Sequence, residues 1–167
     1  MAQPVSFDIT STVDLQEVDN AVNQAKKELA QRYDFKGSKS SIDFRKADAA
    51  IDLQADDKFK MEAVWEVLQT RLFRRGVPAK NAKLGEVEPA SGGLVKATVS
   101  LQQGIPSDTA KQIVKFLKDA KLKKVQAAIQ ADQLRVSSGS KDDLQVAIRL
   151  LKEQDFGIEL QFGNYRG

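Results

Sequence analysis

Residues 41–54 read SIDFRKADAAIDLQ, and this stretch decides the fold. Apolar and polar residues alternate over 41–45 and again over 50–54, which is typical of two strands that each bury one face. Only a short polar segment separates them, so they are predicted to pair as an antiparallel hairpin. On either side, apolar residues recur every three or four positions from 15 to about 33 and from 57 to about 75, which indicates amphipathic helices. Asp14 is predicted to cap the first of them. The stretch is therefore the centre of a helix–strand–strand–helix unit.

The same order of patterns returns in the second half of the chain. A strand pattern at 5–9 precedes the first helix, and Glu88–Gly93, rich in Pro, Gly and Ser, is predicted to be the linker between the halves. The second half then reads as a strand at 94–101, a helix capped by Ser107, strands at 124–130 and 134–138, a helix capped by Ser140 and a strand at 158–162. Val125, Ala127 and Ile129 are expected to face the core. The order β-α-β-β-α-β is that of a ferredoxin-like unit, an antiparallel sheet with helices on one face. The predicted fold class is α+β, with two such units.

Composition excludes several classes of enzyme. The 167 residues include no cysteine and no histidine. Zinc sites of the usual Cys/His kind and nucleophiles activated by histidine are therefore excluded. The paired carboxylates Asp56/Asp57 and Asp142/Asp143 begin predicted helices, where capping explains them. We expect a protein that is not an enzyme and has no metal or cofactor. The absence of a signal-peptide pattern and of a membrane-length apolar run indicates a cytoplasmic protein without membrane contact.

Charge is distributed unevenly along the chain. The formal net charge is +3, but residues 1–88 carry 14 Lys/Arg against 15 Asp/Glu, whereas residues 89–167 carry 12 against 8. The second half, at about +4, is suited to an anionic partner, although it lacks the dense basic surface of a strong nucleic-acid binder.

The most promising binding stretch is Arg32–Ser41, which follows the first helix. It combines cations with a glycine and hydroxyls, and it offers freely aimed backbone N–H groups, as a phosphate ester requires. The candidate residues are Arg32, Lys36, Gly37 and Lys39. The alternative is a plain helix end, at which the cations complement the dipole and Gly37 makes the turn.

Three further segments are candidates for anion or base binding. The loop Gln102–Pro106 opens a helix whose free N–H groups can hold an anion, with ordinary hydration as the alternative. Lys121, Lys123 and Lys124 form a basic corner, which can contact phosphates or simply be solvated. The segment Phe162–Arg166 places Tyr165 and Arg166 close together, and an aromatic ring with Arg is a combination that a purine site uses.

Several motifs resemble those of the YajQ family of small bacterial proteins. They are spread in order over nearly the whole chain: Ser6-Phe7-Asp8, Glu17–Val22, Arg32–Gly37, Leu101–Ile105, Asp142–Gln145 and Leu160–Phe162. The resemblance implies two ferredoxin-like units that exchange their N-terminal strands. The first unit is then residues 11–104, with strand 94–101 swapped in. The second is residues 1–10 and 105–167, with strand 5–9 swapped in.

The resemblance also implies nucleotide binding. Some members of the family are described as cyclic di-GMP receptors that act on a transcription factor, and binding of RNA, including transfer RNA, has been suggested. By motif match, the candidate ligand surface comprises Arg32, Asp34, Phe35, Lys36, Gly37, Gln102, Gln103 and Gly104. One departure concerns Gly139-Ser140-Lys141, because a Gly-Lys-Lys-Arg run is expected there and two cations are missing.

Two binding hypotheses follow, besides a third in which the protein is an enzyme that acts on a phosphoester. Without histidine and cysteine that enzyme would depend on carboxylate–metal chemistry, and the paired carboxylates are already explained by capping. In the first, the protein is a receptor for cyclic di-GMP or a related nucleotide that signals through a protein partner such as a transcription regulator. The phosphates of the nucleotide would contact the Arg32–Lys39 segment, and one of its bases would lie near Phe35 or Tyr165. In the alternative, it binds RNA through Lys121, Lys123, Lys124 and Arg135, with steep salt dependence. The strands at 124–130 and 134–138 contain no aromatic residue, so bases are not expected to stack on that sheet.

Overall fold

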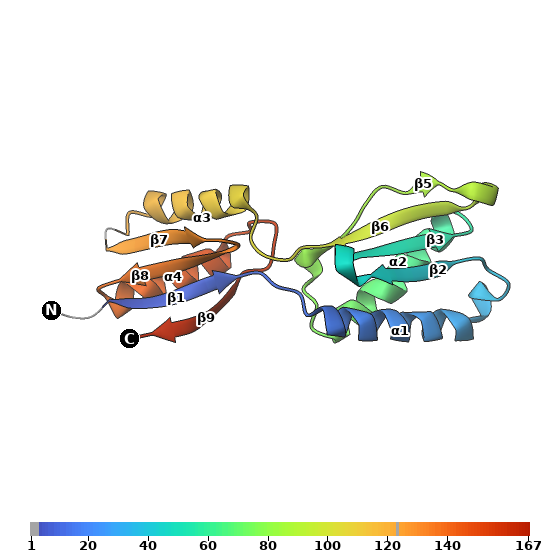
Figure 1. The fold of residues 1–167 in the computed structure, drawn as a ribbon, viewed down its shortest axis with the longest axis horizontal. Coiled ribbons are helices and arrows are strands. Elements are labelled where there is room, and N and C mark those ends of the chain that lie inside the picture. The colour runs from blue at the N-terminus through green and yellow to red at the C-terminus, as the bar shows by residue number, and fades with distance from the viewer. Residues whose placement is uncertain (1–3, 123) are drawn as a thin grey trace. The chain divides into compact units, whose positions relative to one another are not determined.

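The structure is a computed structural model that describes residues 4–122 and 124–167. The chain forms two compact units (Figure 1). We call residues 13–102 the middle unit, and residues 1–12 together with 103–167 the terminal unit. Lys123, predicted to belong to a basic corner, and residues 1–3 lie outside the described residues.

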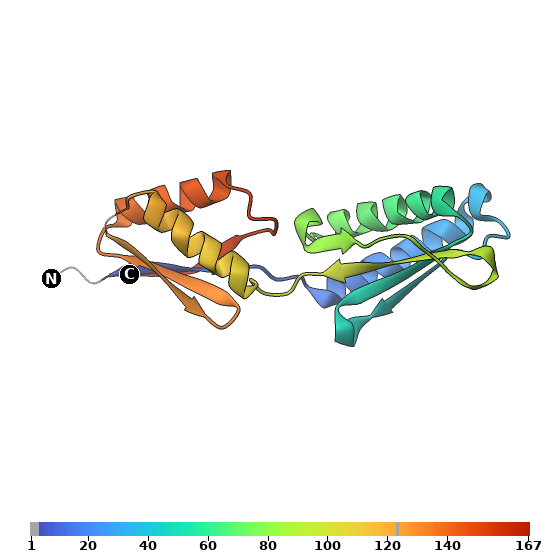
Figure 2. The same cartoon turned by 90° about the horizontal axis from the view of Figure 1, so that it is seen from above.

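The middle unit contains two long helices and one antiparallel sheet. Its main elements are α1 (Leu15–Gln31), β2 (Ser41–Arg45), β3 (Ala50–Ala55), α2 (Lys58–Arg74), β4 (Ala82–Leu84), β5 (Glu88–Pro89) and β6 (Val95–Leu101), with 3-10 turns η1 (Tyr33–Phe35), η2 (Lys46–Asp48), η3 (Ala79–Asn81) and η4 (Ser91–Gly93). The strand order is β2-β3-β6-β4, with β5 paired to β6. Both helices cover the same face of the sheet (Figure 2).

The terminal unit repeats this design. Its elements are β1 (Val5–Thr10), α3 (Ser107–Asp119), β7 (Val125–Gln130), β8 (Gln133–Ser138), α4 (Lys141–Glu153) and β9 (Gln161–Arg166). The strand order is β7-β8-β1-β9, all antiparallel, and α3 and α4 lie on one face (Figure 2). The predicted α+β class, compatible with two ferredoxin-like units, is confirmed.

The strand that precedes each unit's first helix in the sequence lies inside the sheet of the other unit. β1 precedes α1 in sequence but lies between β8 and β9, with Phe7 opposite Val136. β6 precedes α3 but lies between β3 and β4, with Val99 opposite Ile51. In each sheet the strand that precedes the other unit's first helix thus fills an interior position.

Each unit has its own hydrophobic core. The apolar stripe of α1, including Val18, Val22 and Leu29, packs with that of α2 against the middle sheet. In the terminal unit, Phe7 and Ile9 of β1 are fully buried beneath α3 and α4. In every helix the buried residues belong to the stripe of regularly spaced apolar residues, so the sequence pattern alone specifies which face turns inward.

The predicted helix caps are mostly confirmed. Asp14, Asp57 and Ser140 accept from backbone N–H groups in the first turns of α1, α2 and α4, at 3.0, 2.7 and 3.3 Å. The cap predicted at Ser107 is wrong, since Pro106 occupies that position and no side chain caps α3.

Other sequence predictions were wrong in position. Glu88–Gly93 is not a linker between the units: β5 pairs with β6, so the Pro/Gly/Ser segment is a turn within the middle unit. The last strand covers Gln161–Arg166 rather than 158–162, because pairing with β1 decides where it begins. Ile129 was expected to face the core but is 45% exposed, since β7 is an edge strand.

Candidate functional site

In the structure, the stretch Arg32–Ser41 is a folded loop held by its own polar groups. Arg32 makes a bidentate ion pair with Asp34, at 3.0 and 2.8 Å. This pairing lowers the pKa of the Asp34 carboxyl and raises that of the Arg32 guanidinium. Phe35 is buried, and the Arg32 and Lys60 cations lie 5.4 and 4.8 Å from the centre of its ring. Arg32 therefore has a partner before any ligand arrives.

The expectation of freely aimed backbone N–H groups in this loop is wrong for four residues. The N–H groups of Lys36 and Ser38 donate to carbonyls at 3.1 and 3.0 Å. Lys39 donates to Asp56 Oδ1 at 3.0 Å, and Ser40 donates to Ser38 Oγ at 3.1 Å. Asp56 also accepts from the Ser38 hydroxyl, which lowers the pKa of its carboxyl. Asp56, expected to cap α2, instead ties this loop to the start of α2.

Asp56→Ala is expected to loosen the loop without unfolding the middle unit. The substitution removes the acceptor of Lys39 N–H and of the Ser38 hydroxyl, and an acceptor that carries charge holds such groups more firmly than a neutral one does. Amide exchange at Lys39 should become at least severalfold faster, while exchange in β3 stays unchanged. Asp57→Ala is the control, because it removes only the α2 cap. Unchanged exchange at Lys39 would contradict the role of Asp56.

A pocket of about 410 Å³ lies beside this loop, between α1 and the edge strand β2. Phe35, Leu29 and Ile42 supply its apolar wall, and Ser38 and Ser40 supply hydroxyls, which are already hydrogen-bonded to each other. The side chains of Lys36 and Lys39 are exposed. Two ammonium groups therefore remain at this loop for an anion.

The loop at Gln102–Gly104 is fixed by backbone contacts. Gln102 N–H donates to the Asn81 carbonyl at 2.8 Å, and Gly104 N–H donates to the Ser11 carbonyl at 2.6 Å. Gly104 also lies against Asp132 in the β7–β8 turn. Gln102 and Gly104 thus attach their loop to the segments that contain Asn81, Ser11 and Asp132.

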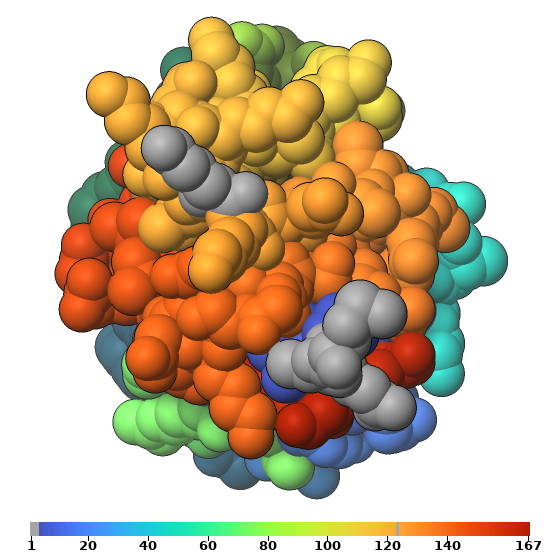
Figure 3. Space-filling model, turned by 90° about the vertical axis from the view of Figure 1, so that its left-hand side faces the viewer, coloured from blue at the N-terminus to red at the C-terminus, as the bar shows by residue number. Residues whose placement is uncertain are grey.

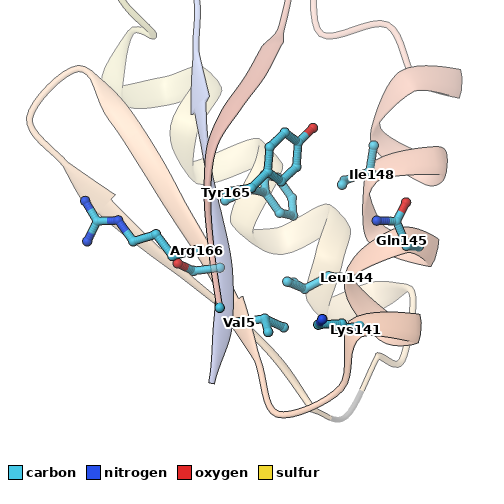
Figure 4. Close-up of a pocket in the computed structure, with 10 residues that line it drawn as sticks. Val5, Lys141, Leu144, Gln145, Ile148, Tyr165 and Arg166 are labelled. Carbon is cyan, nitrogen blue, oxygen red and sulfur yellow. The ribbon is translucent and has the colours of Figure 1, made fainter. Parts of the chain in front are cut away.

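A second pocket, of about 340 Å³, lies in the terminal unit between α4 and the ends of β1 and β9 (Figure 4). We call it the α4–β9 pocket. Val5, Phe7, Leu144 and Ile148 form its apolar lining. Its polar lining residues are Ser6, Lys141, Gln145, Tyr165, Arg166 and Gly167. An aromatic ring, an amide and a cation thus surround an apolar floor.

A bulge in β9 gives this pocket its aromatic wall. Asp8 pairs with Gly163 and Ser6 with Arg166, so β9 has one residue more than β1 between these pairs, and Asn164 adopts a left-handed φ of 53°. As a result Phe162 and Tyr165 both lie beside Phe7, with ring centroids at 5.9 and 6.3 Å. Tyr165 points toward α4 and remains 62% exposed, whereas Arg166 points away (Figure 4).

The opposite face of the sheet carries an ion pair in which only the carboxylate is buried. Asp8 is buried and accepts from Arg135 Nε at 3.0 Å and from Asn164 Nδ2 at 2.5 Å. These two hydrogen bonds, Arg135 first, hold the pKa of the Asp8 carboxyl below its ordinary value. Arg135, predicted as an RNA contact, therefore already has an intramolecular partner.

Comparison with known proteins decides the family. The family described as "Nucleotide-binding protein YajQ-like" matches residues 5–166. The chain belongs to this family. It is 55% identical over 161 residues to a protein of Trichlorobacter lovleyi named "Nucleotide-binding protein", with 96% of this chain and 98% of that protein covered. A protein of the same name from Carboxydothermus hydrogenoformans is 51% identical over 166 residues, covering 99% of this chain and all of the relative.

The residues predicted for this YajQ-family chain fall in separate places. Arg32 to Lys39 lie in the middle unit, whereas Gln103, Gly104, Arg135, Tyr165 and Arg166 lie in the terminal unit. Within the terminal unit, Tyr165 lines the α4–β9 pocket, Arg135 lies on the other sheet face, and Gly104 lies at the β7–β8 turn. As ligand contacts, all of these residues stay predictions.

Sequence reasoning did not select Lys141 and Gln145 as binding residues. They lie four residues apart, and Ile148 follows at the next turn, so one stripe of α4 lines the pocket. That helical spacing was readable from the sequence. The bulge that turns Tyr165 toward this stripe was not, since it depends on pairing with β1.

Among residues 4–122 and 124–167, no group of three or more acidic side chains is placed to hold a metal ion. In the same part of the chain, none of the helices has the length and apolar character needed to span a membrane.

Proposed function

We propose that this YajQ-family chain binds a nucleotide in the α4–β9 pocket, with the base stacked on Tyr165. The observation that carries the proposal is an exposed tyrosine ring facing the apolar side of α4, with Gln145 and Lys141 on the same helix stripe. Tyrosine supplies a stacking surface for any base, and a glutamine amide can hydrogen-bond to a base edge. The name shared by relatives at about 50% identity supports the same function.

Charge at the pocket favours a ligand with few phosphate charges. The lining contains two cations, Lys141 on the α4 stripe and Arg166, whose side chain points away (Figure 4). Asp142 and Asp143 follow Lys141 in the first turn of the helix. These carboxylates oppose a triphosphate, which carries several negative charges, more strongly than a phosphodiester, which carries one. Cyclic di-GMP, with two phosphodiesters, meets this condition. A volume of about 340 Å³ accommodates one nucleoside, so the rest of a dinucleotide would lie over the rim.

Tyr165→Ala is expected to weaken nucleotide binding by about 5- to 150-fold, because stacking of a base on an aromatic ring contributes about 1–3 kcal/mol. Calorimetric titration with cyclic di-GMP, GMP and GTP, at low and physiological salt, measures this. Tyr165→Phe keeps the ring and should bind like the unmodified protein. Tyr33→Ala is the matched control, since Tyr33 is also exposed, at 89%, but lies in the Arg32–Ser41 loop.

The opposite result would move the site to the middle unit. If Tyr33→Ala or Lys36→Ala weakens binding and Tyr165→Ala does not, the nucleotide binds at the Arg32–Ser41 loop beside the pocket of Phe35 and Ser38. If no nucleotide binds, the proposal fails in both forms.

The finer role that we propose is that of a cytoplasmic receptor without catalytic activity. Occupied by cyclic di-GMP, it would change its affinity for a protein partner such as a transcription regulator, by favouring one of two conformations. The full sequence has neither histidine nor cysteine, which agrees with a binding role. Pull-down of a candidate regulator with and without cyclic di-GMP tests this step, because a receptor requires the two amounts to differ.

RNA binding by the terminal unit is the alternative function. Residues 89–167 have an excess of four basic residues, and Lys121 and Lys124 are exposed. A short single-stranded RNA in the same titration separates the two functions. Affinity for RNA that falls steeply with salt, without any saturable nucleotide binding, would support the alternative.

A further inference from the structure

The outer face of α3 carries an unpaired row of lysines. Lys111, Lys115 and Lys118 are exposed and lie four and three residues apart, so they share one face of the helix. Among the described residues, none of them forms an ion pair with a carboxylate. In Figure 3 the yellow-orange atoms of α3 lie on the surface of the terminal unit. This face is therefore cationic and accessible.

Beside the lysines lies a small apolar groove. It has a volume of about 270 Å³ and is lined by Val114 and Ile129 together with the three lysines and Asp119. Ile129 is on β7, and 45% of it is exposed. A β-branched residue on the helix side of a strand is normally covered by the next strand, which β7 lacks.

β7 also has unused backbone groups. It is the edge strand of the terminal sheet and pairs only with β8 among the described strands. In an antiparallel pair, alternate residues direct their N–H and C=O groups away from the partner strand, so one row of donors and acceptors along β7 faces outward. Figures 1 and 2 both show α3 running along β7, so the lysine row follows this edge.

We propose that β7 accepts an extended acidic segment of a partner protein as an added strand. Backbone hydrogen bonds to β7 provide the pairing, an apolar side chain covers Ile129 and Val114, and carboxylates meet the lysines of α3. Lys111 and Lys118 are about 10 Å apart along the helix, whereas same-face residues of a strand are about 7 Å apart. Two or three acidic residues at alternate positions therefore match the lysine row. This surface is separate from the α4–β9 pocket, and the inference does not depend on nucleotide binding.

A nucleic acid is the less suitable occupant. Phosphates would engage the three lysines, but they would use neither the outward backbone groups of β7 nor the exposed Ile129. The acidic segment accounts for all three features with one ligand.

The experiment uses the full chain and an array of ten-residue peptides in which Glu or Asp alternates with Val, Ile, Leu or Phe. We expect saturable binding of members of this array, and at least tenfold weaker binding of the same peptides by Lys115→Glu and by Ile129→Glu. Lys27→Glu, an equal charge change at an exposed position of α1, should bind normally. Circular dichroism checks that each variant is folded.

Two further measurements distinguish a peptide that binds as an added strand from one held only by ionic contacts. Peptides with proline at alternate positions cannot pair with β7 and should not bind. Amide exchange in β7 should slow on addition of the binding peptides. The proposal is overturned if the proline-containing peptides bind as tightly as the peptides without proline. It is also overturned if a ten-nucleotide RNA binds equally to the unmodified protein and to Ile129→Glu while the peptides do not bind. It is also overturned if no peptide binds, in which case the lysines only protect the edge from aggregation.

Discussion

Gly104→Ala is expected to destabilise the terminal unit by about 2–4 kcal/mol. Gly104 has a φ of 82°, a conformation that disfavours any side chain. A Cβ atom at this position would lie 2.7 Å from Asp132 Cβ and 2.6 Å from Asp132 Oδ2. The segments that contain Gly104 and Asp132 cannot easily move apart, because backbone hydrogen bonds hold them. Gly104 N–H donates to the Ser11 carbonyl, and Ile105 N–H donates to the Asp132 carbonyl.

Gly37→Ala is the matched control for this substitution. Gly37 also has a positive φ, of 76°, but no atom lies within 4 Å of the added Cβ. Gly37→Ala should therefore lower the free energy of unfolding by only about 1 kcal/mol, which is the contribution of the unfavourable backbone conformation. Amide exchange in β1 reports on the terminal unit, and the fluorescence of Trp65, the one tryptophan of the chain, reports on the middle unit. Equal costs for the two alanines would show that contact with Asp132 is unimportant.

Asp8→Ala is expected to lower the free energy of unfolding of the terminal unit by about 1.5–3 kcal/mol at pH 7. The substitution removes the acceptor of two polar groups at the centre of the sheet. Arg135 and Asn164 would lose their shared partner. Arg135→Gln should cost less alone, since its side chain is partly exposed. A double-mutant cycle of the two substitutions measures their coupling, and additive costs would contradict the ion pair.

The Asp8 ion pair also predicts a dependence on pH. The pKa of Asp8 is lower in the folded protein than its ordinary value, so the folded state binds the proton less readily than the unfolded state. The stabilisation is therefore fully present above about pH 5 and is lost as the pH falls below about 4, through the folded pKa. The stability difference between the unmodified protein and Asp8→Asn should shrink between pH 7 and pH 3. A constant difference would exclude this linkage.

Much of the fold was predictable because it depends on local patterns. The alternation at 41–45 and 50–54 specified the hairpin, and the helical stripes and the residues Asp14, Asp57 and Ser140 located three helix starts. The linker was misplaced because Pro and Gly mark turns without distinguishing a turn inside a unit from a boundary between units. Pairing of β5 with β6, which decides the matter, is a contact with a strand further along the chain.

The candidate site was less predictable. Tyr165 was selected from the sequence because an aromatic residue beside Arg suits a base, but its neighbours Lys141 and Gln145 were not selected. Conversely, Arg32 and Arg135 were selected for their charge, and both have carboxylate partners in the structure. Charge is read directly from sequence, whereas whether a charge is free depends on which side chains the fold brings within hydrogen-bond distance.

The sequence by itself determined the four helices, most of the strands, the inward face of each helix, and the absence of histidine and cysteine chemistry, because these properties depend on residue type and short-range spacing. The short strands β4 and β5 were not predicted. Only the tertiary structure decided that β1 lies beside β8 and β9, that the bulge at Asn164 turns Tyr165 toward α4, and that the edge of β7 lies open beside the lysines of α3. The physical reason is that strand pairing joins residues more than a hundred positions apart, and one extra residue in a strand moves a side chain to the other face of the sheet.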